Sequence, residues 1–212
     1  MKVLIFLGAP GSGKGTQAAK LVEKYPFKIV STGNLIRQHI RDNTPLGQEL
    51  SPFLSSGRLV PDALIIDLFK DYMRSLDGEG IILDGFPRTE GQCKALDSLL
   101  KNDFPQAKAT VFFFNVPLEV VKKRMLGRLT CKACDAVYHK ETQPPKQTGI
   151  CDRCGGSLTV RADDTEAVIE ERAKIFEKEL NPILGHYGTK AICTIDASQN
   201  PDQVFAQVES KL

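Results

Sequence analysis

The stretch Gly8-Ala9-Pro10-Gly11-Ser12-Gly13-Lys14-Gly15-Thr16 decides the fold of this chain. A short apolar run, Val3–Leu7, precedes it, and helix-forming residues, Gln17–Val22, follow it. The stretch fits the pattern G-x-x-x-x-G-K-[ST], except that glycine takes the Ser/Thr place and threonine comes next. Glycines let backbone N–H groups close around phosphate oxygens, and the helix N-terminus and the lysine add positive charge. The order of strand, glycine loop, lysine and helix therefore predicts a nucleotide phosphate site rather than a chance turn.

Further apolar runs predict more strands of the same kind. Each is short and continuously apolar, as expected of a parallel strand covered on both faces. They are Lys28–Val30, which is the weakest, Gly80–Leu83, Thr110–Phe114 and Ala191–Ile195. Helical periodicity is clearest over residues 64–76 and 204–212, the latter after the start signal Asn200-Pro201-Asp202. The alternation predicts an α/β fold with a five-stranded parallel sheet flanked by helices, like that of P-loop nucleotide-binding proteins.

Size and composition narrow the class of protein. With 212 residues, the chain suits one compact α/β domain with an insertion or two. Its formal net charge of +2 gives no electrostatic argument for a nucleic-acid or membrane partner. No apolar run approaches a membrane span, and the short apolar N-terminus runs directly into the glycine loop instead of forming a signal peptide. We therefore expect a cytoplasmic protein whose six cysteines are thiols or metal ligands rather than disulfides.

Two segments interrupt the alternation of strands and helices. Residues 31–60 hold short helical pieces and turn residues but no strong strand. Residues 129–160 hold four cysteines and few large apolar side chains. Both are expected to be insertions into a core made of residues 1–30, 61–128 and 161–212.

The second insertion carries the pattern C-x2-C-x16-C-x2-C, formed by Cys131, Cys134, Cys151 and Cys154. This spacing is typical of a zinc ion held by four thiolates, with each pair in a tight knuckle. Gly155-Gly156 gives the second knuckle the backbone freedom that it needs. Four protein ligands leave no open position, so the metal would be structural rather than catalytic. Iron would also suit four sulfurs, and two disulfides or unpaired thiols are the alternatives without a metal.

The remaining cysteines and the histidines are expected to pack or to lie at the surface. Cys193 falls inside a predicted strand and should be a small buried apolar residue. Cys93 falls on a predicted helix, and the pattern does not fix its exposure. The histidines show no ligand spacing with one another: His39, His139 and His186.

Several arginines stand where a bare helix or an apolar face would not favour them. Arg124 and Arg128 lie four apart on the helix predicted after Pro117, where like charges repel by roughly 0.2–0.5 kcal/mol. Arg172 has apolar neighbours three and four positions away, so it needs a carboxylate from elsewhere or a bound anion. An ion-paired or snorkelling side chain explains most single arginines. Phosphoryl transfer uses such dispersed charge, because its transition state spreads negative charge over several oxygens. The whole set is Arg37, Arg88, Arg124, Arg128, Arg161 and Arg172.

Four segments, in order, resemble those of adenylate kinases, which are nucleoside monophosphate kinases. The long forms of this family carry an inserted segment with four cysteines, called the lid. The loop 8–16 has the glycine and threonine that follow the lysine in that family. Ser31–Arg37 resembles the start of its AMP-binding region, Asp84–Thr89 with Gln92 its acceptor-binding turn, and Arg161–Asp164 the return from its lid. The resemblance covers essentially the whole chain. It makes residues 31–60 the AMP-binding segment and residues 129–160 the zinc-bearing lid.

The resemblance implies an activity and its partners. The expected reaction is MgATP + AMP ⇌ 2 ADP by direct in-line transfer, serving adenine nucleotide homeostasis. ATP, AMP and ADP are then the partners, with Mg²⁺ on the nucleotide and Zn²⁺ in the lid. The resemblance also implies a monomer.

The resemblance implies roles for individual residues as well. The catalytic group would be Lys14, Arg88, Arg128, Arg161 and Arg172. The ATP site would comprise Gly11, Ser12, Gly13, Lys14, Gly15, Thr16, Arg124 and Arg128, with Arg124 packing on the adenine. The AMP site would comprise Thr32, Arg37, Arg58, Val60, Gly85, Arg88, Gln92, Arg161 and Arg172. Within it, Arg37 and Arg88 would clamp the phosphate, and Thr32 and Gln92 would recognise the base.

Asp84 ends the third predicted strand, and ligands bind at the carboxyl ends of such strands. It resembles the residue that holds the waters of Mg²⁺ in its outer shell, the alternative being a helix or turn cap. Two positions depart from the family. Asn34 stands where aspartate is more common, and Leu129 stands where a second arginine is common. The sequence does not fix how these two departures affect the affinity for AMP and the closing of the lid.

Two rival functions share some of these features. A kinase acting on CMP or UMP would have the same fold and arginines, although Thr32 and Gln92 favour adenine. A zinc-ribbon module that binds nucleic acid or protein would explain the cysteines. The cysteine segment, however, lacks a dense basic and aromatic surface, so no nucleic-acid partner is expected.

Overall fold

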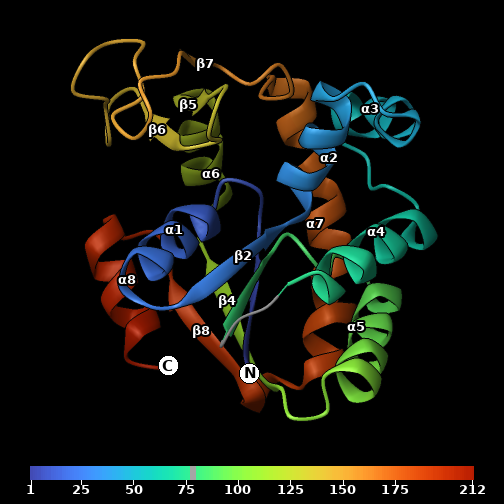
Figure 1. Cartoon of the computed structure of the whole chain (residues 1–212). Helices are drawn as coiled ribbons and strands as arrows, with labels where there is room; N and C mark the ends of the chain where they lie inside the picture. Colours follow the sequence, from blue (N-terminus) through green and yellow to red (C-terminus); the bar gives the residue numbers. More distant parts are fainter. Residues whose placement is uncertain (77–79) are drawn as a thin grey trace.

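The computed structural model describes residues 1–76 and 80–212. Its main sheet has five parallel strands in the spatial order β2-β3-β1-β4-β8 (Figure 1). The strands are β1 (Lys2–Gly8), β2 (Phe27–Ser31), β3 (Gly80–Asp84), β4 (Lys108–Asn115) and β8 (Ile192–Asp196). The α/β class and the five-stranded parallel sheet predicted from the sequence are confirmed.

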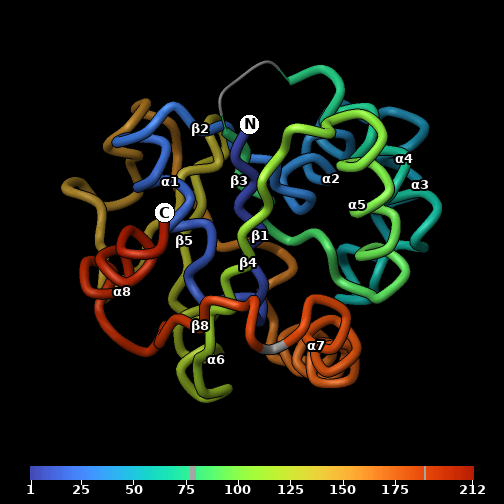
Figure 2. The backbone as a smooth tube through the Cα atoms, turned by 90° about the horizontal axis from the view of Figure 1, so that it is seen from below, coloured from blue at the N-terminus to red at the C-terminus, as the bar shows by residue number. Residues whose placement is uncertain are grey.

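Helices cover both faces of this sheet (Figure 2). One face carries α1 (Lys14–Lys24) and α8 (Pro201–Glu209), and the other carries α4 (Asp62–Arg74), α5 (Glu90–Asp103) and α7 (Glu166–Tyr187). Successive side chains of a strand point to opposite faces. Leu4 and Phe6 therefore pack under the first pair of helices, whereas Val3, Ile5 and Leu7 pack under the other three. All five side chains are at most 4% exposed, which explains why β1 is apolar at every position.

Two segments project beyond the carboxyl edge of the sheet (Figure 1). The first holds α2 (Thr32–Arg41) and α3 (Pro45–Ser56), and Thr44 caps α3 by accepting a hydrogen bond from the Gly47 backbone N–H at 3.0 Å. The second holds a small antiparallel sheet in the order β6-β5-β7. Its strands are β5 (Arg128–Cys131), β6 (Val137–His139) and β7 (Leu158–Thr159). The remaining elements are α6 (Leu118–Leu126) and a 3-10 helix, η1 (Thr189–Ala191).

The prediction that Arg128 shares a helix with Arg124 is wrong. Helix α6 ends at Leu126, and Arg128 begins β5, where it pairs with His139 of β6. The chain turns at Gly127, where an added Cβ would lie 2.2 Å from the His139 ring. Arg128 therefore belongs to a strand that pairs with residues 7 to 11 positions further along the chain. The repulsion expected between the two arginines within one helix does not arise.

Three smaller differences concern the ends of elements and one cysteine. Helix α4 ends at Arg74, so Leu76 lies outside it, and β8 begins at Ile192 because Ala191 belongs to η1. Cys193 is only half-buried, because its strand is at the edge of the sheet, whereas Cys93 is fully buried. In the part of the chain that the structure describes, no helix combines the length and apolar character needed to cross a bilayer.

Candidate functional site

The phosphate loop connects β1 to α1 and packs closely against α6. Gly11 has φ +85°, and a Cβ at this position would lie only 2.7 Å from the Met125 Cγ. Any side chain would therefore push the loop away from α6. Gly13 ends the loop at the N-terminus of α1, in the left-handed conformation. Backbone N–H groups at this helix start have no partner within the helix, which suits an anion.

Lys14, the first residue of α1, folds back over the loop. Its Nζ donates hydrogen bonds to the carbonyl oxygens of Gly8 and Ala9, each at 2.8 Å, and to the Ser12 Oγ at 3.2 Å. Burial lowers the pKa of Lys14 to about 8, although the nearby Asp84 carboxylate opposes this shift. The ammonium is thus held by neutral oxygens, with no direct carboxylate partner among the described residues, and remains available to a phosphate.

A cleft of about 980 Å³ opens along the carboxyl edge of the main sheet, between the two projecting segments. Every residue that the sequence assigned to a nucleotide or to Mg²⁺ lines it. They are Gly11, Ser12, Gly13, Lys14, Gly15, Thr16, Thr32, Arg37, Arg58, Val60, Asp84, Gly85, Arg88, Gln92, Arg124, Arg128, Arg161 and Arg172. The cleft therefore gathers residues that are far apart in the sequence.

Two arginines that line the cleft, Arg128 and Arg172, are oriented by the neighbouring aspartates Asp163 and Asp164. Arg128 makes a two-pronged ion pair with Asp164, in which Nε donates to Oδ2 at 2.7 Å and Nη2 donates to Oδ1. Arg172 donates to Asp163 Oδ2 at 2.5 Å and to the carbonyl oxygen of Leu54 in α3 at 3.4 Å. Both guanidinium groups are therefore fixed before any ligand binds. The carboxylate that the sequence required for Arg172 comes from outside its helix.

These ion pairs hold Asp163 in its charged form. Burial alone would raise the pKa of Asp163, but its hydrogen bond to Arg172 and the charges of Arg172, Arg37 and Arg161 outweigh burial and lower it. Sequence reasoning placed Asp163 and Asp164 only in the return from the lid and gave them no role in the site. One signal could have identified them. Asp163 and Asp164 are adjacent acidic residues that closely follow Arg161, in a segment expected to pack near other arginines.

Two other arginines have incomplete sets of partners. The Nε of Arg37 is buried and has no hydrogen-bond partner among the described residues, while its Nη2 donates to Asn34 Oδ1. Arg161 donates through Nε to Thr130 Oγ1 at 2.8 Å, and its other nitrogens make no hydrogen bond to the residues that the structure describes. Burial lowers the pKa of both arginines, and in Arg161 the charges of Arg128 and Arg37 lower it further. Buried donors without partners are rare, so the buried Nε of Arg37 suits a bound anion.

Arg88 lies at the bottom of the cleft, after β3. Its Nε donates to the Gly85 carbonyl oxygen at 2.7 Å. The open cleft exposes its side chain to water, but surrounding protein and the charge of Arg172 lower its pKa. Gly85 has φ +85°, and a Cβ there would lie 2.8 Å from both Arg88 Nη2 and Thr32 Oγ1, so this turn requires glycine.

Thr32 and Gln92, the expected base-recognition residues, are each 2% exposed at the wall of the cleft. Thr32 Oγ1 donates to the Gly85 carbonyl oxygen at 2.7 Å. The Gln92 amide donates to Asp62 Oδ1 at 2.8 Å and accepts from the Arg88 backbone N–H at 2.8 Å. Both side chains are thus held by the protein itself.

Arg124 stands at the opposite end of the cleft, on α6. Its Nη1 donates to the Ala197 carbonyl oxygen at 2.8 Å and lies 3.4 Å from that of Ser12. Its Nη2 reaches the carbonyl oxygens of Ser198 and Gln199 at 3.5 and 3.4 Å. Arg124 therefore ties the phosphate loop to the segment 197–199. Sequence reasoning missed this segment, which contributes backbone oxygens and carries no side-chain signal.

Asp84 and Arg58 complete the list of predicted residues in the cleft. The Asp84 carboxylate accepts no side-chain hydrogen bond from the described residues, and a Cβ on Gly15 would lie 3.4 Å from its Oδ2. This carboxylate beside the phosphate loop fits a residue that binds the waters of a hydrated cation, rather than a cap. Arg58 is exposed and its Nε donates to Ser56 Oγ at 3.1 Å, so it lies at the rim.

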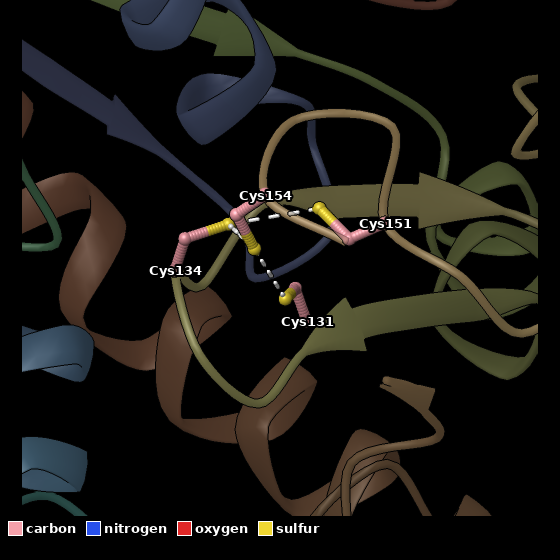
Figure 3. Close-up of side chains that lie close together, drawn as sticks. All are labelled: Cys131, Cys134, Cys151 and Cys154. Atoms are coloured by element: carbon pink, nitrogen blue, oxygen red, sulfur yellow. Dashed lines mark hydrogen bonds between the residues drawn. The ribbon is translucent and has the colours of Figure 1, made fainter. Parts of the chain in front are cut away.

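The four lid cysteines converge from two loops, with their sulfurs pointing toward one another (Figure 3). All four Sγ atoms lie within 4.8 Å of one another, and three of the pairs are separated by 3.3, 3.5 and 3.6 Å. These separations are too long for disulfide bonds. A tetrahedral ion with Zn–S bonds of about 2.3 Å places sulfurs about 3.8 Å apart, so the cluster fits a four-thiolate metal site.

The surroundings of the cysteines support the same interpretation. Tyr138 Oη lies 3.5 Å from Cys151 Sγ and accepts the Asp152 backbone N–H at 2.9 Å, which orients that thiol. An added Cβ on Gly156 would lie 3.0 Å from Cys131 Sγ, so glycine leaves the sulfurs room. His139 is on β6 beside Gly127 and does not belong to the cluster.

Comparison with known proteins places the chain among well-described enzymes. Residues 6–192 match the family model described as adenylate kinase. The curated adenylate kinases of Clostridium tetani and Archaeoglobus fulgidus are each 40% identical over 99% of this chain and 97% of their own length. That of Clostridium kluyveri is 42% identical over the same shares.

Proposed function

The chain belongs to the adenylate kinase family, and we propose that it transfers the γ-phosphoryl group of MgATP to AMP through the residues of the cleft described above. The observation that carries the proposal is the arrangement of positive charge. Lys14 lies at one wall, and Arg88, Arg128, Arg161 and Arg172 converge on the space in front of it. Such a constellation suits a transferring phosphoryl group, which needs positioning and charge neutralisation rather than a strong base.

In the proposed reaction, the phosphate loop and Lys14 hold the β- and γ-phosphates of ATP. Lys14 exchanges the carbonyl oxygens of Gly8 and Ala9 for phosphate oxygens. Arg124, between the loop and the segment 197–199, supports the adenine of ATP. Arg37, whose buried Nε lacks a partner, and Arg88 clamp the phosphate of AMP.

A phosphate oxygen of AMP then attacks the γ-phosphorus as the bond to the β–γ bridging oxygen breaks, giving two ADP. Arg128 and Arg172, fixed by Asp164 and Asp163, neutralise charge that develops on the transferred group. Bound Mg²⁺ would supply further charge neutralisation, with Asp84 holding its waters. The segments 31–60 and 129–160 would close over the nucleotides and exclude water as a competing acceptor.

The lid metal is proposed to be Zn²⁺ held by Cys131, Cys134, Cys151 and Cys154. The separations of the four sulfurs support this assignment. Its contribution would be structural, since the four thiolates fill a tetrahedral site. The cysteines form no disulfides among the described residues, which supports a reducing, cytoplasmic location, and membership of the family supports a monomer.

Replacing Lys14 with methionine tests the mechanism. Lys14→Met keeps the length of the side chain but removes its charge, so we expect ADP formation from ATP and AMP to fall by at least about a hundredfold. Thermal unfolding and metal content should be unchanged, which shows that the fold is intact. Lys20→Met is the matched control and should keep full activity, because Lys20 lies on the same helix but outside the cleft, where it pairs with Asp202 of α8. Near-normal turnover by a folded Lys14→Met protein would contradict the mechanism.

A further inference from the structure

Asp62 joins the starts of two helices at the wall of the cleft. It is the first residue of α4, and its carboxylate accepts two hydrogen bonds from α5 and its cap. Gln92 Nε2 donates to Oδ1 at 2.8 Å, and Thr89 Oγ1 donates to Oδ2 at 2.7 Å. Thr89 Oγ1 in turn accepts the Gln92 backbone N–H at 3.1 Å, so Asp62 contacts Gln92 directly and through its cap.

These contacts allow the Gln92 amide only one of its two orientations. Its nitrogen faces a carboxylate, which only accepts hydrogen bonds, and its oxygen accepts from the Arg88 backbone N–H, which only donates. A flipped amide would place its oxygen against the carboxylate and its nitrogen against that N–H. Both contacts would then be repulsive at a side chain that is 2% exposed.

The fixed amide has consequences for the base that it meets. After its contacts with Asp62 and Arg88, Gln92 keeps one N–H and one oxygen lone pair, and it lines the cleft. A 6-aminopurine presents an acceptor at N1 and a donor at the 6-position, which match these two groups. A 6-oxopurine presents a donor at N1 and an acceptor at the 6-position, and would match only the flipped amide.

We propose that Asp62 is a positioning residue that fixes the Gln92 amide and thereby selects 6-aminopurine over 6-oxopurine nucleoside monophosphates. The proposal rests on the proposed role of Gln92 in binding the acceptor base. Asp62 would touch no nucleotide itself. Removing its carboxylate lets the amide turn over, so the enzyme loses discrimination rather than the ability to transfer phosphate.

A neighbouring glycine allows a test that keeps the carboxylate. An added Cβ on Gly91 would lie 2.8 Å from Asp62 Oδ2, so Gly91→Ala must displace Asp62 without removing its charge. Gly91 lies in α5 with no positive φ, so alanine is compatible with the local backbone. Asp62→Ala and Gly91→Ala should therefore have the same effect by different routes.

The experiment compares kcat/KM for AMP with that for IMP, at saturating MgATP. The wild-type ratio should fall about 10- to 100-fold in Asp62→Ala, as expected for one hydrogen bond to a charged group. The ratio should also be lower than that of the wild type in Gly91→Ala. Asp62→Asn, which keeps an oxygen for Gln92 Nε2, should recover most of the ratio. The KM for ATP should stay unchanged in all three, and Asp67→Ala, on the exposed face of α4, should behave as wild type.

The variant Gln92→Leu tests the role of Gln92 in recognising the base separately from the positioning role of Asp62. Asp62→Ala should lower the ratio no further when added to Gln92→Leu, because Asp62 acts only through the amide. An unchanged ratio in Asp62→Ala, beside a lowered one in Gln92→Leu, would overturn the positioning role and leave base recognition intact. An unchanged ratio in Gln92→Leu would overturn both, and equal losses for AMP and IMP in Asp62→Ala would mark it as merely structural.

Discussion

Arg41 of α2 donates two parallel hydrogen bonds to Asp135 of the lid, from Nη1 to Oδ1 at 3.1 Å and from Nη2 to Oδ2 at 3.2 Å. The pair links the two projecting segments directly across the mouth of the cleft. Asp135 follows the second cysteine of its knuckle and has φ +56°, a conformation that Gly155 adopts with φ +73° in the other knuckle. A left-handed aspartate is less favourable than a glycine by about 1 kcal/mol. This conformation places the Asp135 carboxylate where it accepts the two hydrogen bonds from Arg41.

Arg41→Ala should remove the direct link between the two segments. Exposed ion pairs contribute up to about 1 kcal/mol, so we expect the KM values for ATP and AMP to rise together, about two- to fivefold. High salt should reduce the difference from wild type, because ions screen exposed charges. Steady-state kinetics at low and high salt measure both effects. Arg74→Ala removes an exposed pair with Asp103 outside the cleft and is the control. The same shift in the control would remove the special role of the Arg41–Asp135 pair.

The pKa of Lys14 predicts an alkaline limit to activity. Burial lowers this pKa to about 8, so the free enzyme loses the charged form of Lys14 as the pH rises through that value. Since the charged form binds phosphate, kcat/KM for MgATP should fall about tenfold per pH unit above about pH 8. At saturating nucleotide the phosphates raise the pKa, and kcat should persist to higher pH.

Lys14→Arg provides the control for this profile. Arginine stays charged throughout the range, so the lower activity of this variant should show no fall between about pH 7 and about pH 10. An alkaline limb at the same pH in both proteins would assign the titration to another group.

Removing the lid metal should unfold the lid before the core. Structural Zn²⁺ contributes about 10–16 kcal/mol in peptide sites, and the only buried apolar cluster of the lid is Cys131, Tyr138, Cys151 and Leu158. After chelation, hydrogen exchange should become fast over residues 129–160 while β1 and β3 stay protected. Cys151→Ser should have the same effect, whereas Cys193→Ser, on β8, should keep one metal per chain. Unchanged exchange and unchanged thermal unfolding of a metal-free protein would contradict a structural zinc site.

Much of the fold follows from short-range patterns in the sequence. The edge strand β2, with Lys28 and Ser31, had the weakest pattern. The other strands were predictable because they hold continuous apolar runs, most fully in β1 and β3, which are covered on both faces. The end of α6 was not, because it depends on pairing between Arg128 and His139, which no local pattern encodes. The half-buried position of Cys193 likewise depends on β8 being an edge strand.

The same distinction between local patterns and long-range contacts applies to the residues of the candidate site. Lys14 and the four cysteines were predictable because their chemistry requires a fixed spacing along the chain. The partners of the arginines were not, since Asp164 reaches Arg128 across 36 residues and Asp62 reaches Gln92 across 30. Such pairs are set by the packing of elements that are far apart in the sequence, which no local pattern encodes. Asp135 gave no signal either, because its left-handed backbone is visible only in the folded knuckle.

The most direct test of the central claim is Mg²⁺-dependent ADP formation from ATP with AMP, CMP, UMP or GMP as separate acceptors. We expect a strong preference for AMP, because Gln92 and Thr32 line the acceptor end of the cleft. A preference for CMP or UMP would keep the fold and the phosphate chemistry but contradict the assignment of the base. No transfer to any acceptor, from a folded and metal-loaded sample, would contradict the proposed function itself.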